Sequence, residues 1–402
     1  MGAKVPEPRS HPGRRVSAAA TDRRPRVAIV QRYIASYRAP FYDRLRSELA
    51  LRGIDLTLAV SSDPRHPSAR GDEVAIPGAI EIPGREFGVL GYRALWQPLT
   101  PEIRAADLVV VEQASRLLLN YLLLARQRLM RRPVAFWGHG RSFDDRDSGS
   151  LEERLKRWTS RHVHWWFAYN DLAADVVREL GFPPQRITVV ENSTDTRALR
   201  AAVEAVDPAT IAETRRSFGL GPGPVGIFVG NFSHPKQLDF LFEAAEHLHR
   251  LDPGFSLLMV GQGERQPVVE EMAARRPYVS YVGNRFGDDL ARCFAVADVL
   301  MVPGWAGLVL VDGFAGGTPP MVSASFPHPP EISYVDPGGN GLVIEDGGSP
   351  ARYAERVHRL LGDGDERARL VEGCAKAAEY YSIEAMAERF ADGLSAALVR
   401  AR

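Results

Sequence analysis

The sequence has little of what marks disulfide-rich, zinc-binding or membrane-spanning proteins. Its 402 residues include only two cysteines, Cys293 and Cys374, with no paired Cys or His spacing. This argues against a disulfide framework or a zinc site, and it suits a reducing cytoplasm. The longest apolar run, LLLNYLLLA over residues 117–125, is too short to span a bilayer. We expect it to form a buried helix, with a membrane-facing surface and peripheral membrane contact as the second interpretation.

The sequence also has no net charge and few lysines. Fifty basic residues balance fifty acidic ones, which argues against a protein that holds nucleic acid through bulk charge. Only four of the bases are lysines, at positions 4, 156, 236 and 376. The bias toward arginine, alanine, glycine and proline is typical of a bacterial genome rich in G and C. Any anionic ligand is therefore expected to be held by local groups.

The length and the pattern of apolar runs predict two α/β domains. A chain of this size suits two cores of about 150 to 200 residues each. Short β-rich runs alternate with helical stretches from Arg26 onward, which is typical of parallel sheets with crossover helices. Predicted strands occupy 26–31, 54–60, 107–112, 133–138, 164–169 and 187–192 in the first half, and 225–230, 255–261, 279–283, 298–303, 320–324 and 341–345 in the second.

The segments between these runs set the predicted boundaries. Residues 1–25 are basic, rich in Pro and Ser and without the apolar core of a signal peptide, so we expect a disordered tail. The first domain is expected over 26–205 and the second over 206–380, because the glycine- and proline-rich stretch around 219–226 reads as a domain edge. Residues 381–402 carry an amphipathic period behind Ser382 and predict a closing helix that packs toward the first domain.

Two turns that follow predicted strands carry unusual residues, and ligands bind at such turns in doubly wound folds. In the first, Lys236 lies where a helix begins, an end that already carries partial positive charge. In the second, VPGWAGLVLVDGF, a helix predicted to start near Ala306 would leave the amides of Gly307, Leu308 and Val309 open to an anion. Asp312 would share that face and suit the hydroxyls of a ribose. A solvated lysine and an ordinary first-turn acid are the plainer alternatives.

The run FVGNFSHPKQLDFLFEAA, followed by LLMVGQGE, AVADVLMVPG and GLVLVDGFAGGTPPMVSA, resembles the second half of the retaining, metal-independent GT-B glycosyltransferases of family four. YRAPFYDRL, WGHGRSF and VVENSTDT in the first half also look like that family. The resemblance implies an α/β fold of two Rossmann-like domains facing across a cleft, and sugar transfer from a nucleotide diphosphate sugar without a metal or other cofactor. It implies a glycan, lipid-linked or small-molecule acceptor.

The resemblance also implies site residues. It gives the catalytic roles to His139, Lys236 and Asp312, and it places the acceptor side at Arg38, Tyr37 and His139. Glu331 would meet the ribose or base, unless it caps a helix. The donor side would comprise Gly230, Asn231, Lys236, Gly283, Asn284, Gly304, Gly307, Leu308, Val309 and Asp312.

Three of these positions depart from the family pattern. Asn231 replaces an arginine, Gly304 replaces the first glutamate of a paired-acid motif, and Asp312 shortens the second. Losing a forked cation and a sugar-binding acid would each weaken donor binding by ~1 to 3 kcal/mol. A GT-B remnant that binds a partner without catalysis is therefore the alternative function, and a nucleotide-sugar epimerase is a third. The DxD at 145–147 is treated as a chance match, and Trp165 and Trp166 as core residues.

Overall fold

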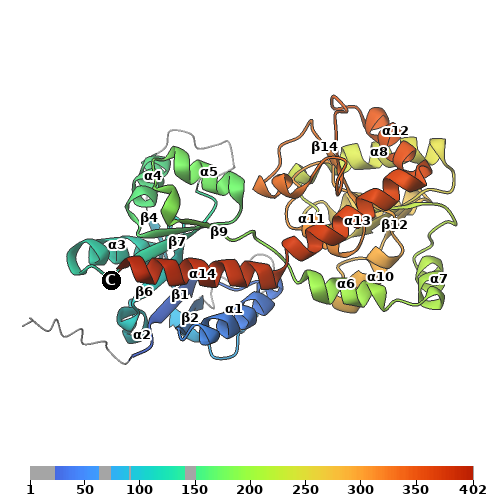
Figure 1. Cartoon of the computed structure of the whole chain (residues 1–402). Helices are drawn as coiled ribbons and strands as arrows, with labels where there is room; N and C mark the ends of the chain where they lie inside the picture. The colour runs from blue at the N-terminus through green and yellow to red at the C-terminus, as the bar shows by residue number, and fades with distance from the viewer. Residues whose placement is uncertain (1–22, 63–73, 90–91, 141–150, 402) are drawn as a thin grey trace, which may run out of the picture.

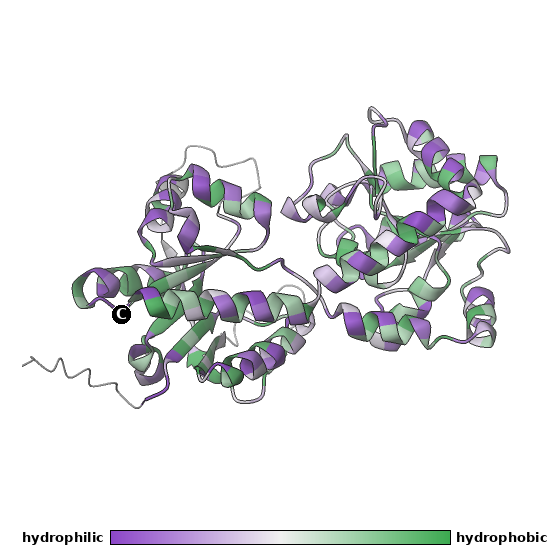
Figure 2. Ribbon diagram, viewed as in Figure 1, coloured by the Kyte–Doolittle hydropathy of each residue, from purple (hydrophilic) through white to green (hydrophobic). Residues whose placement is uncertain are grey.

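The computed structural model describes residues 23–62, 74–89, 92–140 and 151–401. The chain forms two α/β halves joined at a narrow crossing (Figure 1). Each half has one fully parallel sheet with helices on both faces. Hydrophobic residues lie on the strands and on the sides of the helices that cover them, as Figure 2 shows.

The first sheet has seven strands in the order β3-β2-β1-β6-β7-β8-β9. One face is covered by α1 and α14, and the other by α2, α3 and α5. All six predicted strands are present, but β3 and the β4-β5 hairpin were not predicted, because they are short and carry little apolar periodicity. The strands are β1 Arg26–Gln31, β2 Asp55–Ser62, β3 Ile80–Pro83, β4 Arg85–Val89, β5 Tyr92–Trp96, β6 Leu108–Glu112, β7 Val134–Gly138, β8 Trp165–Ala168 and β9 Ile187–Val189; the helices are α1 Ala39–Leu51, α2 Pro101–Ala105, α3 Leu118–Met130, α4 Leu151–His162, α5 Asp171–Glu179 and α14 Ile383–Ala401.

The second sheet has six strands in the order β12-β11-β10-β13-β14-β15. Each of the six lies within a predicted strand, so the second half follows its sequence pattern throughout. The strands are β10 Val225–Val229, β11 Ser256–Val260, β12 Val279–Tyr281, β13 Val299–Met301, β14 Pro320–Ser323 and β15 Leu342–Ile344; the helices are α6 Thr196–Glu204, α7 Pro208–Ser217, α8 Leu238–Leu251, α9 Gln266–Arg275, α10 Gly287–Ala295, α11 Val309–Ala315, α12 Pro350–Gly362 and α13 Gly364–Tyr380.

The chain crosses between the halves twice. It leaves the first half after β9, and α6 already packs against α10 and α11 of the second half, ahead of the predicted boundary at residue 205. After α13 it returns, and α14 lies along α1 on the first sheet (Figure 1). The last helix is therefore part of the first half's core.

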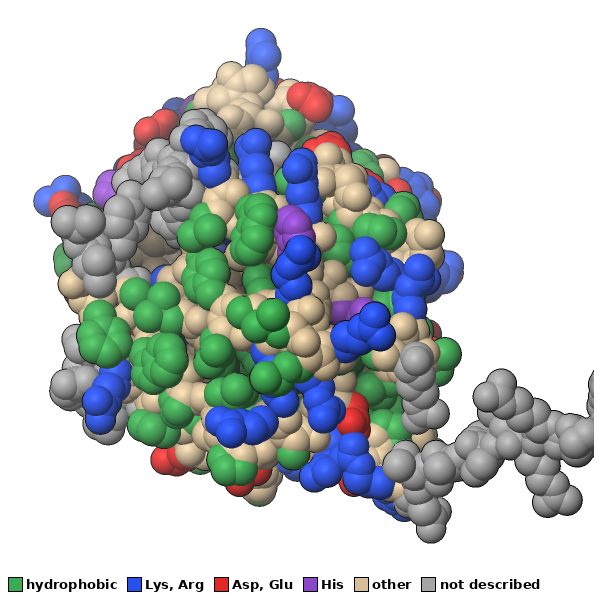
Figure 3. Space-filling view, turned by 90° about the vertical axis from the view of Figure 1, so that its left-hand side faces the viewer, with side chains coloured by type: hydrophobic (Ala, Val, Ile, Leu, Met, Phe, Trp, Pro, Cys, Tyr) green, Lys and Arg blue, Asp and Glu red, His purple; other side chains and the backbone are tan. Residues whose placement is uncertain are grey.

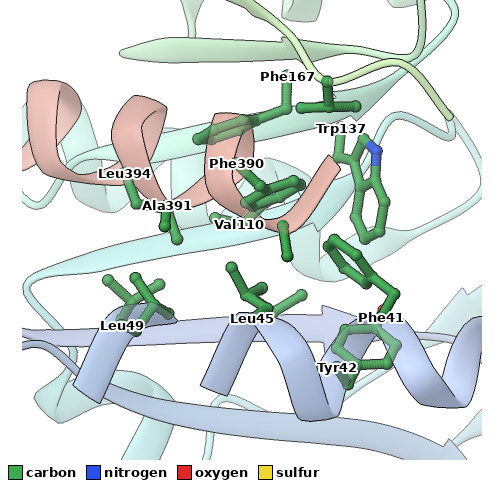
Figure 4. Packing of buried hydrophobic residues seen from close by; sticks show 14 of the residues in the cluster. Phe41, Tyr42, Leu45, Leu49, Val110, Trp137, Phe167, Phe390, Ala391 and Leu394 are labelled. Atoms are coloured by element: carbon green, nitrogen blue, oxygen red, sulfur yellow. The ribbon is translucent and has the colours of Figure 1, made fainter. Parts of the chain in front are cut away.

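Phe390 shows how α14 is held. Its ring stacks on Phe167 of β8 with centroids 4.2 Å apart, and it meets Trp137 of β7 edge-on at 4.9 Å. Phe41 of α1 closes the cluster (Figure 4). Aromatic pairs in these geometries add to the stabilisation from burial.

Trp165 and Trp166 lie buried in β8, which confirms them as core residues. The apolar run at 117–125 forms most of α3, whose buried side includes Leu119 and Leu123. Leu122 on its other side is exposed, so the helix is only half covered. Among the described residues, no helix combines the length and the apolarity needed to cross a membrane.

Candidate functional site

The turns after β10, β11 and β12 pack directly on one another at the edge of the second sheet where those strands end. The amide of Gly230 donates to the carbonyl of Val260 at 3.0 Å, and that of Gly261 to the carbonyl of Gly283 at 2.9 Å. Gly261 has φ +140°, and a Cβ there would collide with the carbonyl of Gly230. Glycine is thus required for this close approach.

Lys236 lies on the same edge, at the end of the 3-10 turn His234–Lys236 that precedes α8. Its ammonium donates to the backbone carbonyl of Trp305 at 2.7 Å. Trp305 belongs to the segment that follows β13, so the hydrogen bond joins the two turns singled out in the sequence. The ammonium is fixed beside the chain that enters α11.

The helix start predicted near Ala306 is wrong. α11 begins at Val309 and has only seven residues. The amide of Ala306 lies ahead of the helix and donates to Nδ1 of His328 at 3.1 Å. Nε2 of His328 donates to the carbonyl of Ser323 at 2.9 Å, which fixes a neutral imidazole. Burial, followed by the charge of Lys236, lowers the pKa of His328. Sequence reasoning missed this residue, since a histidine in a Pro-rich loop gives no signal of its own.

Gln237 accounts for the glycine at position 304. A Cβ on Gly304 would lie 2.6 Å from Cγ of Gln237 and 2.6 Å from the carbonyl oxygen of Pro235. Gln237 has φ +57° and Trp305 has φ +50°, a left-handed conformation that non-glycine residues seldom adopt. One strained residue, Gln237, therefore follows Lys236 directly, and the other, Trp305, accepts the hydrogen bond from Lys236. Strain of this kind is concentrated at functional sites. Sequence reasoning did not identify Gln237 as a site residue either.

Asp312 lies half-buried on α11 and faces the crossing between the halves. Its carboxylate accepts a hydrogen bond from Oγ1 of Thr194 at 2.7 Å. Burial raises the pKa of Asp312 to about 6, although the Thr194 hydrogen bond favours the charged form. The acid predicted to meet a ribose thus already has one hydroxyl partner from the chain itself.

The first half contributes a caged cation. The guanidinium of Arg38 lies 4.9 Å from the centroid of the Trp137 ring and 5.7 Å from that of Tyr169, and Nη2 reaches the hydroxyl of Tyr37 at 3.3 Å. Its Nη1 is buried with no hydrogen-bond partner among the described residues. His139 packs 4.4 Å from the Tyr169 ring, and burial, with the charges of Lys156 and Arg38, lowers its pKa to about 4. His139 is therefore neutral at pH 7.

Glu331 lies between the two groups of residues. It is buried in the 3-10 segment Pro330–Tyr334, and its carboxylate is approached by the side-chain amide of Asn192 at 3.5 Å. Burial raises its pKa, while Asn192, Arg38 and Lys236 act in the opposite direction. The charges of Arg38 in the first half and Lys236 in the second thus both favour the ionised form of this one carboxylate.

The other predicted residues are less closely gathered. Asn231 lies over Gly263, whose Cβ would meet its Oδ1 at 2.6 Å, and Asn284 is exposed beyond β12. Gly307 and Leu308 directly precede α11. The DxD at 145–147 falls outside the described residues. Within those residues no group of three or more His, Cys, Asp or Glu side chains is arranged to hold a metal ion.

Two family models match the chain, one in each half. Residues 41–198 match Glycosyltransferase Family 4, and residues 223–363 match Glycosyl transferases group 1. The chain belongs to the family-four glycosyltransferases. Its match to these models confirms the family resemblance of the motifs in both halves.

Named relatives agree with this assignment. The chain is 29% identical over 248 residues to a D-inositol 3-phosphate glycosyltransferase of Nocardia farcinica, which covers 56% of this chain and 51% of that protein. It is 26% identical over 223 residues to a GDP-mannose-dependent alpha-(1-6)-phosphatidylinositol monomannoside mannosyltransferase of Mycobacterium tuberculosis, covering 48% and 57%. The chain thus spans about half the length of the curated relatives it matches.

Solved structures confirm the GT-B fold. The structure of Anabaena Alr3699/HepE in complex with UDP aligns with a TM-score of 0.68 at 16% identity, covering 92% of this chain and 99% of that one. Two parallel sheets, each in a half of its own, with a helical carboxyl end therefore form the architecture that the sequence predicted.

Proposed function

We propose that this family-four member is a retaining glycosyltransferase that moves a sugar from a nucleotide diphosphate sugar to an acceptor without a metal or other cofactor. The observation that carries the proposal is the hydrogen bond from Lys236 to the carbonyl of Trp305, which holds an ammonium beside the segment entering α11. The family assignment, and the named activities of the relatives, point to the same class of reaction.

In this proposal the donor's diphosphate lies against Lys236 and the backbone of Gly307 and Leu308. The bond between the anomeric carbon and the diphosphate oxygen breaks, and the acceptor oxygen forms its bond to that carbon on the same face. The acceptor's proton passes to an oxygen of the departing diphosphate. A preorganised ammonium stabilises the charge that develops there. Asp312 takes the ribose hydroxyls beside its Thr194 contact.

The donor sugar itself would meet Gln237. The family's first glutamate is replaced by Gly304, and the side chain of Gln237 lies against that glycine. An amide offers both a donor and an acceptor to sugar hydroxyls, whereas a carboxylate only accepts. We therefore expect Gln237 to set which sugar is transferred.

On the acceptor side, Arg38 and His139 favour a substrate that carries hydroxyls and an anionic group. The buried Nη1 of Arg38 would gain a partner from a phosphate or carboxylate. The neutral His139 would contact a sugar or acceptor hydroxyl at its side of the site. Two of the relatives are named for an inositol phosphate and a phosphatidylinositol mannoside, which are acceptors of this chemical class.

The proposal is tested by thermal shift and mass spectrometry in buffer that contains a chelator. UDP, GDP, ADP and TDP are each added to the full chain, and we expect one of them to raise the melting temperature. Nucleotide sugars of that base are then screened for release of the free nucleotide. If no nucleotide raises the melting temperature and no nucleotide sugar is cleaved, the non-catalytic alternative would be supported instead.

A further inference from the structure

Three helices end together at the end of the first half that lies farthest from the second half. These are α3, α4 and α14, and Figure 1 shows the carboxyl end of α14 beside α3. The side-chain amide of Gln127 donates to the carbonyl of His162 at 2.6 Å, which joins the ends of α3 and α4. Nε2 of His164 contacts the carbonyl of Ala397 at 2.9 Å and joins the end of α14 to them. The three ends form one surface, here called the distal face.

Large apolar side chains stand exposed on the distal face. Leu129 is 80% exposed and Met130 is 67% exposed at the end of α3, and Trp158 of α4 is 52% exposed. Val399 near the end of α14 is 73% exposed. Single exposed apolar residues are ordinary, but a group contributed by three adjacent helix ends marks an interaction surface.

Basic side chains surround this apolar group. Arg128, Arg131, Arg161 and Arg400 are all exposed. Two further bases belong to the same stretch of chain: Arg132 is exposed, and Arg126 is half-buried and donates to the carbonyl of Arg104. Figure 3 looks onto this end of the molecule, where hydrophobic and basic side chains alternate and acidic ones lie toward the rim.

Along each of the three helices, acidic residues are absent from the last turn, which is the end that forms the distal face. α3 contains none, α4 carries Glu152 and Glu153 in its first turn, and the last acid of α14 is Asp392. Asp107, at the start of β6, is paired with Arg23 at 2.7 Å and is 3.8 Å from Arg132. The balance of charge on the distal face is therefore strongly positive, although the chain as a whole has no net charge.

We propose that the distal face is a docking site for an anionic lipid bilayer. Leucine, methionine and tryptophan side chains enter the interface between headgroups and acyl chains, and arginines pair with lipid phosphates, which is how peripheral surfaces bind. Each basic side chain near an anionic membrane adds to the attraction. No helix inserts across the bilayer, and the described part of the chain holds none suited to do so. The enzyme would thus rest on the membrane by the end remote from Lys236.

The test is co-sedimentation of the full chain with vesicles of phosphatidylcholine alone and with vesicles that also contain phosphatidylglycerol. We expect binding to the anionic vesicles and little to the neutral ones, weakening as salt is raised. The variant Leu129→Glu/Met130→Glu removes the apolar contact, and Arg128→Glu/Arg131→Glu reverses two charges. Each is expected to lower the partition coefficient about tenfold or more.

Phe286→Glu is the matched control, because Phe286 is 65% exposed but lies in the second half. It should bind anionic vesicles like the parent chain, and all variants should keep the parent's melting temperature, since the altered side chains are exposed. Equal binding by the parent and the distal-face variants would overturn the proposal, as would no binding to anionic vesicles. A concentration-dependent dimer that the Leu129→Glu/Met130→Glu variant abolishes, without vesicle binding, would assign the face to a second copy and also overturn it. None of these results depends on transferase activity.

Discussion

The hydroxyl of Thr194 donates to the carboxylate of Asp312 across 2.7 Å, and this hydrogen bond joins the crossing segment to α11. Thr194 precedes the first helix of the second half, while Asp312 lies within the predicted donor site. The segment that crosses between the halves therefore contacts an ionisable residue of the site directly. Burial raises the pKa of Asp312 to about 6, and the hydrogen bond from Thr194 acts against burial because it favours the charged carboxylate.

Asp312→Asn should separate stability from binding. A carboxyl whose folded pKa exceeds its unfolded value contributes stability below the unfolded pKa and loses it as the pH rises through about 6. The variant should thus be more stable than the parent at pH 8, by up to about 3 kcal/mol, and by only about 1 kcal/mol at pH 4.5. Thermal unfolding from pH 4.5 to 8 measures this. Nucleotide affinity should fall in the same variant, and unchanged affinity would remove Asp312 from the donor site.

Lys236→Ala should abolish the donor's diphosphate contact. We expect nucleotide diphosphate affinity to fall by about 2 kcal/mol, or roughly thirtyfold, because a charge-assisted hydrogen bond is lost. Lys376→Ala is the control, since Lys376 is an exposed lysine of α13 that pairs with Glu372 one helical turn away. Isothermal titration with the nucleotide found by thermal shift compares the three proteins. Equal affinities in all of them would contradict the proposed site.

Gln237 and Gly304 should behave as a coupled pair. Gly304→Ala introduces a Cβ that collides with Gln237 and with the carbonyl of Pro235, so it should destabilise the chain by about 1–3 kcal/mol. Gln237→Gly frees part of that space and relieves a left-handed residue, by about 1 kcal/mol. The double variant should therefore lose less stability than the sum of the single changes. Strictly additive melting temperatures would show that the two side-chain positions do not compete.

Activity assays can test whether Gln237 contacts the donor sugar. Gln237→Ala should change the ratio of kcat/KM values among nucleotide sugars of one base, while the affinity for the free nucleotide diphosphate stays as in the parent. An equal loss for every sugar would instead assign Gln237 to general packing of the turn.

Phe390→Ala tests the role of the last helix. Removing a ring stacked 4.2 Å from Phe167 leaves a cavity in the core of the first half, and we expect a loss of about 3–5 kcal/mol. Val399→Ala on the exposed side of α14 should change stability by less than about 0.5 kcal/mol. Calorimetry should show the effect in the transition of the first half. A loss confined to the second half's transition would contradict the packing described for α14.

The periodic parts of the chain could be predicted from sequence, and the contacts between distant turns could not. Apolar runs such as 225–230 indicate buried parallel strands whatever surrounds them, so most strands of both main sheets could be predicted. The hairpin β4-β5 lacks that periodicity and was missed. α11 begins later than its local pattern indicated, and the amide of Ala306 donates instead to His328, 22 residues away, a contact that no local pattern could predict. Gln237 and Thr194 gave no local signal, since their importance comes from Gly304 and Asp312.

The return of α14 has a consequence for any attempt to divide the molecule. Cutting the chain within 190–195 gives two pieces, and the shorter one lacks the helix that covers Phe41, Trp137 and Phe167. Expressed alone, residues 23–190 would expose this apolar aromatic surface to water, and we expect the fragment to aggregate. Supplied together, the fragments should reassemble, because the longer one brings the missing cover with it.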